Sequence, residues 1–259
     1  MQDLSVTIIQ IDQIWEDKKA NFSNLENIFS KLESTDLIVL PEMFHTGFSM
    51  NVNELAEKWE DSEGLSFLKT WAKNRKNAFY TSLIIEEKGL FRNRGVFVYP
   101  DGKVEYYDKR KSFGLGGEDR LYTAGDREKI VEFKDWKINL QICYDLRFPE
   151  LIRNRLKTND EPAYDLLIYV ANWPEKRIAH WDALLKARAI ENQCYVVGVN
   201  RVGKDGNELD YSGHSALINA LGETLAEPPQ GKESISTTIL SKNKLVETRN
   251  SLPFLKDIG

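Results

Sequence analysis

Three residues of different chemical types stand at the ends of predicted strands. Glu42 follows a short apolar strand, Cys143 follows residues 138–142, and Lys109 stands where the strand of residues 104–107 enters a long charged loop. Sites in open α/β sheets gather beyond the carboxyl ends of strands, so we expect these side chains to meet. A thiolate can attack a carbonyl carbon, a carboxylate can accept and return the proton, and an ammonium can stabilise the oxyanion. The sequence therefore predicts acyl transfer with no metal and no cofactor.

Each of these residues also has an ordinary structural explanation. A cysteine at a strand end is usually a small buried hydrophobe, Glu42 could cap a turn, and Lys109 could be a solvated member of a basic cluster. Cys143 differs because a polar and charged run, CYDLRFPE, begins at its thiol. Cys194 precedes an apolar run, so we interpret it as a core residue and expect both thiols to be reduced. The combination of the three residue types is what favours chemistry.

Strand and helix patterns alternate along the chain and predict an α/β fold. Strands are predicted at residues 4–11, 36–40, 78–85, 89–99, 103–107, 129–133, 136–142, 165–170 and 195–200, with two or three more between residues 210 and 239. Helices are predicted at residues 21–32, 62–73, from about 147, and 180–193, while residues 108–125 form a long loop. Two halves joined by a meander predict a four-layer α-β-β-α sandwich, with residues 1–259 as a single domain.

Composition narrows the class of partner. The 259 residues include 35 basic and 40 acidic ones, giving a net charge of −5, which argues against nucleic acid or an anionic membrane as the main partner. The longest apolar run, residues 166–171, is far shorter than the roughly 20 residues of a membrane span. The first residues have no basic region and no cleavage site typical of a signal peptide, so we expect a cytoplasmic protein.

Four segments resemble the signature stretches of the nitrilase superfamily of carbon–nitrogen hydrolases. They are residues 40–44 (LPEMF), 107–113 (YDKRKSF), 142–150 (ICYDLRFPE) and 187–192 (ARAIEN), and they occur in the family's order across nearly the whole chain. The resemblance implies the same α-β-β-α sandwich and a Glu-Lys-Cys triad. Glu42 would be the general base, Lys109 the oxyanion stabiliser, and Cys143 the nucleophile that forms a thioester.

The resemblance implies two further groups at the same site. The backbone N–H of Tyr144 would be the second oxyanion donor. Glu118 matches the family's second carboxylate, which positions substrate and catalytic groups, although the adjacent Asp119 competes for that role. A homodimer built on the helices that follow Cys143 and Trp173 is also implied.

Three further segments, residues 41–48, 171–174 and 198–203, are similar to the omega-amidase branch of this superfamily. Its members release ammonia from the distal amide of 2-oxoglutaramate and 2-oxosuccinamate. Ser112 departs from the branch, where a histidine or leucine is more usual before the phenylalanine, and this leaves the substrate detail open. A carboxylate-bearing substrate needs a cation, for which we expect Arg177 ahead of Arg120. The expected aromatic walls are Phe44, Phe48, Phe113 and Trp173.

Other functions stay open at this point. The triad could serve a nitrile or an N-carbamoyl substrate, or the chain could be a non-catalytic scaffold. A papain-like pair of Cys143 with a histidine is the alternative mechanism. The three histidines are too dispersed for metal-ligand spacing, and residues 114–117 lack the strand, helix and lysine of a phosphate loop. No Gly-x-Ser-x-Gly elbow of a serine hydrolase is present in the sequence.

Overall fold

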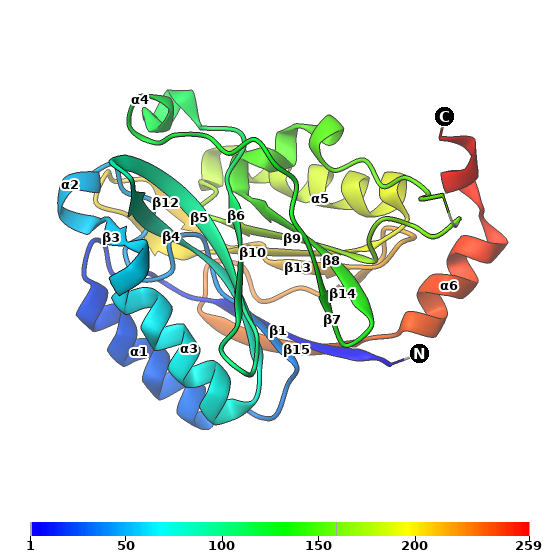
Figure 1. Ribbon diagram of the computed structural model, residues 1–259, viewed down its shortest axis with the longest axis horizontal. Helices are drawn as coiled ribbons and strands as arrows, with labels where there is room; N and C mark the ends of the chain where they lie inside the picture. The colour runs from blue at the N-terminus through cyan, green and yellow to red at the C-terminus, as the bar shows by residue number, and fades with distance from the viewer. Residues whose placement is uncertain (1, 159, 259) are drawn as a thin grey trace.

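Two large β-sheets lie face to face, and helices cover their outer faces (Figure 1). The computed structural model describes residues 2–158 and 160–258. The strands of the first sheet, in spatial order, are β15 (Ser234–Leu240), β1 (Leu4–Gln10), β2 (Leu37–Val39), β4 (Ala78–Glu87), β5 (Leu90–Val98) and β6 (Val104–Asp108), with β3 (Glu57–Lys58) beside β4. Those of the second are β14 (Thr224–Ala226), β13 (Ala216–Ile218), β10 (Tyr195–Asn200), β9 (Leu166–Ala171), β8 (Trp136–Ile142) and β7 (Ile130–Phe133).

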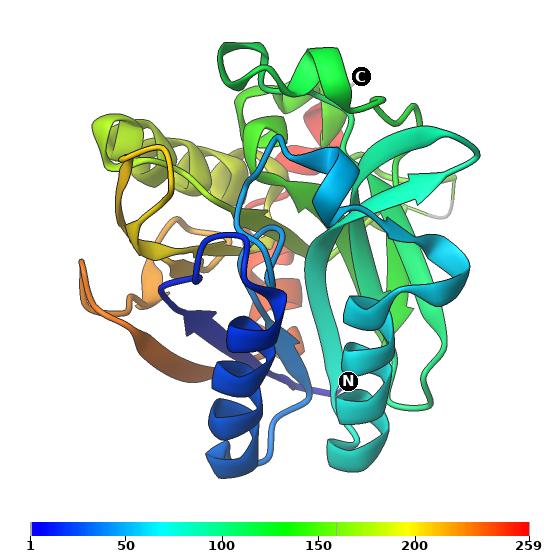
Figure 2. The same cartoon turned by 90° about the vertical axis from the view of Figure 1, so that its left-hand side faces the viewer.

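The helices and a small third sheet complete the fold. The helices are α1 (Lys18–Lys31), α2 (Val52–Leu55), α3 (Glu63–Arg75), α4 (Glu118–Leu121), α5 (Ile178–Asn192) and α6 (Lys242–Ser251). The third sheet pairs β11 (Val202–Lys204) with β12 (Asp210–Ser212). Figure 2 shows α1 and α3 side by side on one outer face. The sandwich predicted from the sequence is confirmed.

Strand alternation sorts the apolar residues between two cores. In β2, Leu37 and Val39 join the cluster between the sheets, whereas Ile38 packs with residues of α1 and α3 on the outer face. On the other side of the molecule, α5 lies close to β10 at Gly198. A Cβ there would come within 2.5 Å of the Leu185 side chain, so the close approach requires glycine.

Most predicted elements are present, but three predictions were wrong or incomplete. The helix predicted from about Arg147 does not form, and two short 3-10 turns stand there instead, Cys143–Arg147 and Pro149–Leu151. A residue before proline avoids the helical region, and Phe148 accordingly has φ −117° and ψ 86°. Four strands, rather than two or three, lie between Asp210 and Leu240, and β11 and α6 were not predicted.

The long loop of residues 108–125 is largely irregular, as predicted, and carries the single turn of α4. None of the helices in the described parts of the chain combines the length and apolarity needed to span a membrane.

Candidate active site

A buried lysine joins two buried carboxylates at the ends of β2, β6 and the start of α4. The Lys109 Nζ donates to Glu42 Oε1 at 3.1 Å and to both carboxylate oxygens of Glu118 at 2.9 Å. All three side chains are at most 3% exposed as residues. The fold thus brings together three residues that lie far apart in the sequence. Asp119, the alternative candidate for the second carboxylate, is exposed.

Asn93 of β5 ties the same two carboxylates together, and sequence reasoning missed it. Its Nδ2 donates to Glu42 Oε1 at 2.7 Å and to Glu118 Oε1 at 3.1 Å. The available signal was a polar run, Arg92-Asn93-Arg94, inside a strand whose later residues are apolar. Glu118 is fixed further by the backbone N–H of Phe113, which donates to Oε2 at 2.6 Å.

Glu42 is also held from the second sheet. The backbone N–H of Asn172, just after β9, donates to Glu42 Oε2 at 2.9 Å. The backbone carbonyl of Glu42 accepts from Asn172 Nδ2 at 2.7 Å and from Gln13 Nε2 at 3.0 Å. The carboxylate is therefore fixed by groups from both halves of the sandwich, which is the preorganisation that acid–base catalysis requires.

Cys143 occupies a tight turn directly after β8. Its φ of 44° lies in the left-handed region, which a non-glycine residue adopts at an energetic cost and which recurs at functional turns. Asp145 holds this turn, because its Oδ2 accepts from the Ile142 N–H at 3.2 Å and from the Tyr107 hydroxyl at 2.8 Å. Its Oδ1 accepts from the Lys111 N–H at 2.9 Å. Asp145 thus connects the cysteine turn to the segment that carries Lys109.

Burial and charge set the protonation of this cluster. Burial alone would lower the pKa of Lys109, but the carboxylates of Glu118 and Glu42 raise it well above 10.5, so the ammonium stays charged. Burial, followed by the negative charge of Glu42, raises the pKa of the Cys143 thiol well above 9. The resting cysteine is therefore a thiol beside a carboxylate that can take its proton.

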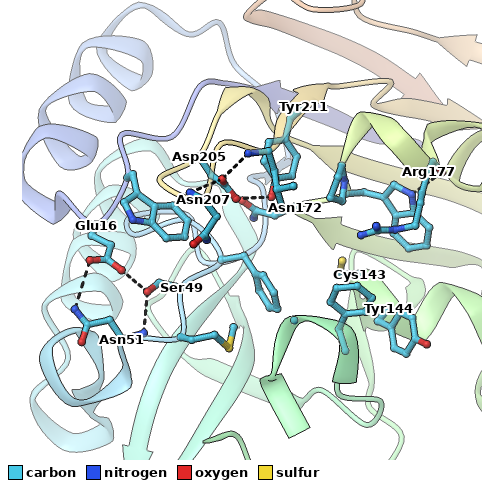
Figure 3. A pocket seen from close by; sticks show the side chains of 18 of the residues that line it. Glu16, Ser49, Asn51, Cys143, Tyr144, Asn172, Arg177, Asp205, Asn207 and Tyr211 are labelled. Atoms are coloured by element: carbon cyan, nitrogen blue, oxygen red, sulfur yellow. Dashed lines mark hydrogen bonds between the residues drawn. The ribbon is translucent and has the colours of Figure 1, made fainter. Parts of the chain in front are cut away.

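A cavity of about 440 Å³ opens beside Cys143. Its wall includes Tyr144 and four of the five residues predicted to bind substrate: Phe48, Phe113, Trp173 and Arg177. Figure 3 shows Cys143, Tyr144 and Arg177 on one side of the cavity, and Glu16, Ser49 and Asn51 on the other.

Two arginines line the cavity, and only one was predicted. The Arg177 guanidinium lies 5.1 Å from the centre of the Phe113 ring, and that of Arg147 lies 4.6 Å from the Trp173 ring. Within the described residues neither forms an ion pair with a carboxylate; Arg147 contacts His180 Nδ1 instead, at 3.2 Å. Burial, and then the nearby Arg177 cation, lower the pKa of Arg147. Two partly buried cations without a carboxylate suit an anionic ligand.

Phe44 was wrongly predicted as a cavity wall. It is fully buried, its ring stacks on His45 at 4.7 Å, and it lies 6.1 Å from the Phe22 ring of α1. The left-handed turn at Met43, with φ 47°, breaks the strand alternation and directs Phe44 into the core under α1 and α3. Arg120, the second choice for a cation, is exposed and is not among the residues that line the cavity.

The histidines do not form a papain-like pair with the thiol. His45 bonds Glu57 at 2.9 Å, His214 bonds Asp182 at 3.0 Å, and His180 contacts Arg147. Cys194 is fully buried in the core. Across residues 2–158 and 160–258, no group of three or more histidine, cysteine, aspartate or glutamate side chains is arranged to hold a metal ion.

Comparison with known proteins gives a consistent result. The family model described as carbon-nitrogen hydrolase matches residues 5–250. Omega-amidase YafV of Yersinia enterocolitica is 40% identical over 99% of this chain and 97% of its own length. The 2-oxoglutaramate amidase of Paenarthrobacter nicotinovorans is 34% identical over 98% of this chain and 88% of its own. Among solved structures, a carbon–nitrogen hydrolase superfamily protein of Xanthomonas campestris with an arsenic adduct in its active site superposes with a TM-score of 0.96. It is 38% identical and covers 100% of this chain and 98% of its own.

Proposed function

Since this chain belongs to the carbon–nitrogen hydrolase family, we propose that it is an omega-amidase that releases ammonia from the distal amide of 2-oxoglutaramate or 2-oxosuccinamate. The observation that carries the proposal is the buried Lys109 ammonium, held by Glu42 and Glu118 next to Cys143. Cys143 lines a cavity that also holds two arginines with no ion pair to a carboxylate among the described residues. This arrangement provides a nucleophile, a base and a cation for the oxyanion, and the two arginines provide an anion site, with Arg177 on the same side of the cavity as Cys143 (Figure 3).

In the first half of the proposed reaction, Glu42 takes the Cys143 proton as the sulfur attacks the amide carbon. The carbonyl oxygen becomes an oxyanion, which the Lys109 ammonium and the Tyr144 N–H stabilise. The C–N bond then breaks while Glu42 returns the proton to the nitrogen, and ammonia leaves. The product of this half is a thioester on Cys143.

In the second half, water attacks the thioester carbon. Glu42 accepts a proton from the water, the same two donors stabilise the second oxyanion, and the C–S bond breaks as the proton passes to sulfur. Glu118 touches Lys109 through both of its oxygens, so its part is to hold the ammonium in place during both halves. Lys109 itself stays charged throughout.

The lining of the cavity supports a substrate that carries a carboxylate. We propose that Arg177 pairs with the carboxylate remote from the scissile amide, with Arg147 as a second cation at the same end. Phe113 and Trp173, which lie against these guanidiniums, exclude water between the two ends of the substrate. Phe48, 5.1 Å from the Lys109 ammonium, closes the wall beside the triad.

A substrate comparison tests the proposal. Ammonia release is measured for 2-oxoglutaramate and for an uncharged amide of similar length that lacks the remote carboxylate. We expect the wild type to prefer the acid, and Arg177→Ala to remove most of that preference while sparing the uncharged amide. An equal loss on both substrates would show that Arg177 supports structure, and Arg147→Ala then tests the second cation.

Other results would favour the alternative functions. Turnover of nitriles or N-carbamoyl compounds with no ammonia from any 2-oxo acid amide would favour the alternative substrates. A Cys143 thiol that fails to react with a small alkylating agent, together with no turnover, would favour a scaffold protein.

The proposal includes the setting of the enzyme. We place residues 1–259 in one domain, because residues of both sheets share one core cluster. We further propose a cytoplasmic homodimer that requires no cofactor and binds neither nucleic acid nor membrane, in keeping with a net charge of −5.

The helix after Trp173, α5, carries Ile190, which is 52% exposed. Ile190 lies beside Gly222, next to the 50% exposed Leu221, and these exposed apolar side chains support a dimer contact there. Sedimentation of wild type and Ile190→Glu tests it.

A further inference from the structure

Asn172 lines the cavity, and among the described residues its side chain has one polar atom without a hydrogen-bond partner. That atom, Oδ1, is buried and accepts no hydrogen bond from the part of the chain that the structure describes. Among the described residues, several buried side chains have an unpaired polar atom, but Asn172 is the one of these that lines the cavity beside Cys143. Figure 3 shows Asn172 and Cys143 on that cavity. A buried acceptor left unpaired is costly, so a partner that arrives with the ligand is the natural explanation.

The orientation of this side chain is fixed by its other contacts. Nδ2 donates to the Glu42 backbone carbonyl at 2.7 Å, and a carbonyl can only accept. A flipped amide would place Oδ1 against the Glu42 carbonyl oxygen and leave Nδ2 without an acceptor. The unpaired atom is therefore the oxygen. The backbone N–H of Asn172 donates to Glu42 Oε2 at 2.9 Å, which places the residue beside the carboxylate that handles the proton.

We propose that Asn172 Oδ1 accepts an N–H of the scissile amide and holds the departing nitrogen beside Glu42. This inference rests on the amidase function proposed above and adds a catalytic residue to it. The site already holds donors for the oxyanion, Lys109 and Tyr144, but an amide nitrogen brings donors of its own. Asn172 supplies the acceptor that these donors need.

The contact acts when the C–N bond breaks. In the tetrahedral intermediate the nitrogen carries two hydrogens and a lone pair, and the lone pair must face the protonated Glu42. An N–H bound to Asn172 Oδ1 sets that rotation, because Asn172 and Glu42 are fixed to each other. The proton then passes from Glu42 to the nitrogen, the C–N bond breaks, and ammonia leaves while the thioester remains. Asn172 itself neither gains nor loses a proton.

The test compares an amide with an ester of the same acid, because an ester has no N–H on its leaving group. The measured quantity is kcat/KM, which covers the steps up to departure of the leaving group. We expect Asn172→Ala and the volume-conserving Asn172→Leu to lower kcat/KM for the amide by about tenfold or more, and for the methyl ester by less than about threefold. An ester loss as large as the amide loss would overturn the proposal, since it would mean that Asn172 only supports Glu42.

Gln13 provides the matched control. It is 1% exposed, donates to the same Glu42 carbonyl at 3.0 Å, and is not among the residues that line the cavity. Gln13→Leu should lower the amide and ester values by the same factor, and an amide-selective loss there would also overturn the proposal. The comparison can use any acyl group that the enzyme accepts. A failure of 2-oxoglutaramate as substrate therefore counts against the proposed function, whereas equal amide and ester losses count against Asn172.

Discussion

Two buried glutamates lie on the segment between β2 and α3, each in a buried polar cluster, but only the cluster of Glu42 adjoins a residue that lines the cavity, Cys143. Glu42 accepts from Lys109 at 3.1 Å beside Cys143, which lines the cavity. Glu57 accepts from His45 Nε2 at 2.9 Å and from the Ser62 hydroxyl at 2.5 Å. Serine, histidine and a carboxylate are the residue types of a hydrolytic triad, yet none of these three lines the cavity.

The two clusters differ in whether a reactive group faces the cavity. Ser62 Oγ accepts from the Leu65 N–H at 3.0 Å and so caps α3, and Glu57 Oε2 also accepts from the Gly64 N–H at 3.1 Å. Burial alone would raise the pKa of Glu57, but the bonds from His45, Ser62 and Lys18 lower it to about 2. At the other cluster the Cys143 pKa is raised and a cavity is open. A set of residue types becomes a site only where reactive groups face open space.

The largest expected difference in activity is between substitutions of the two cysteines. We expect Cys143→Ala to abolish ammonia release, because the nucleophile is lost, whereas Cys194→Ala should keep most of it, because Cys194 is a core residue. Steady-state assays on both purified variants measure this. Comparable losses would remove Cys143 from its proposed role.

The two glutamates give the next largest contrast. Glu42→Gln should lower kcat by at least the ~100- to 10,000-fold typical of a general base, an effect larger than its cost in stability, because Glu118 still pairs with the Lys109 ammonium. Glu57→Gln should do the reverse, costing about 3 kcal/mol of stability because a buried partner of His45 and Lys18 is lost, with kcat per folded molecule largely kept. A Glu57→Gln protein that is stable but inactive would contradict the division.

Lys109→Arg tests the stabilisation of the oxyanion while keeping the positive charge. The Lys109 ammonium is enclosed by two carboxylates at 2.9 and 3.1 Å, and a planar guanidinium neither fits this space nor presents a single donor to an oxyanion. We expect kcat to fall by about 100-fold or more. If most of the wild-type kcat were retained, stabilisation of the oxyanion would have to come from other groups.

Short-range patterns predicted much of this molecule. Clustered β-branched residues and short apolar runs predicted the central strands, and Ser62 with Glu63 predicted the start of α3. The polar run after Cys143 distinguished it from Cys194. The nearly polar α6, with Leu245 as its buried residue among those described, has no comparable pattern and was missed.

The parts of the site that sequence could not supply depend on distant contacts and on turns. Asn93 and Asn172 reach Glu42 across 51 and 130 positions, distances at which no periodicity links residues. Arg147 stood in a wrongly predicted helix, so its side chain had no predicted direction. Phe44 was misplaced because a single left-handed residue, Met43, reverses the side on which the following side chain lies.

The two regions should also differ in how their contributions to stability respond to pH. Glu57 has a folded-state pKa of about 2 against an ordinary 4.5, so the unfolded chain binds the proton more readily, and stability falls as pH drops from about 4.5 towards 2. The burial-lowered pKa of His45 acts in the same direction from 6.5 downward. Beside the active site, burial raises the pKa of Asp145 from 3.8 to about 6, so its contribution to stability rises as pH falls from about 6 to 3.8.

These opposite slopes can be separated by urea unfolding between pH 3 and 7 of wild type, Glu57→Gln and Asp145→Asn. The shifts of Glu57 and Asp145 correspond to roughly 3 kcal/mol each over their full ranges, at about 1.4 kcal/mol per pKa unit. The stability advantage of wild type over Glu57→Gln should shrink as pH falls below about 4.5, because the lost carboxylate is the group being protonated. The advantage over Asp145→Asn should grow between pH 6 and 4, because protonation removes the cost of a buried charge in the wild type alone. If both differences in the free energy of unfolding changed in the same direction with pH, the opposite pKa shifts assigned to Glu57 and Asp145 would be wrong.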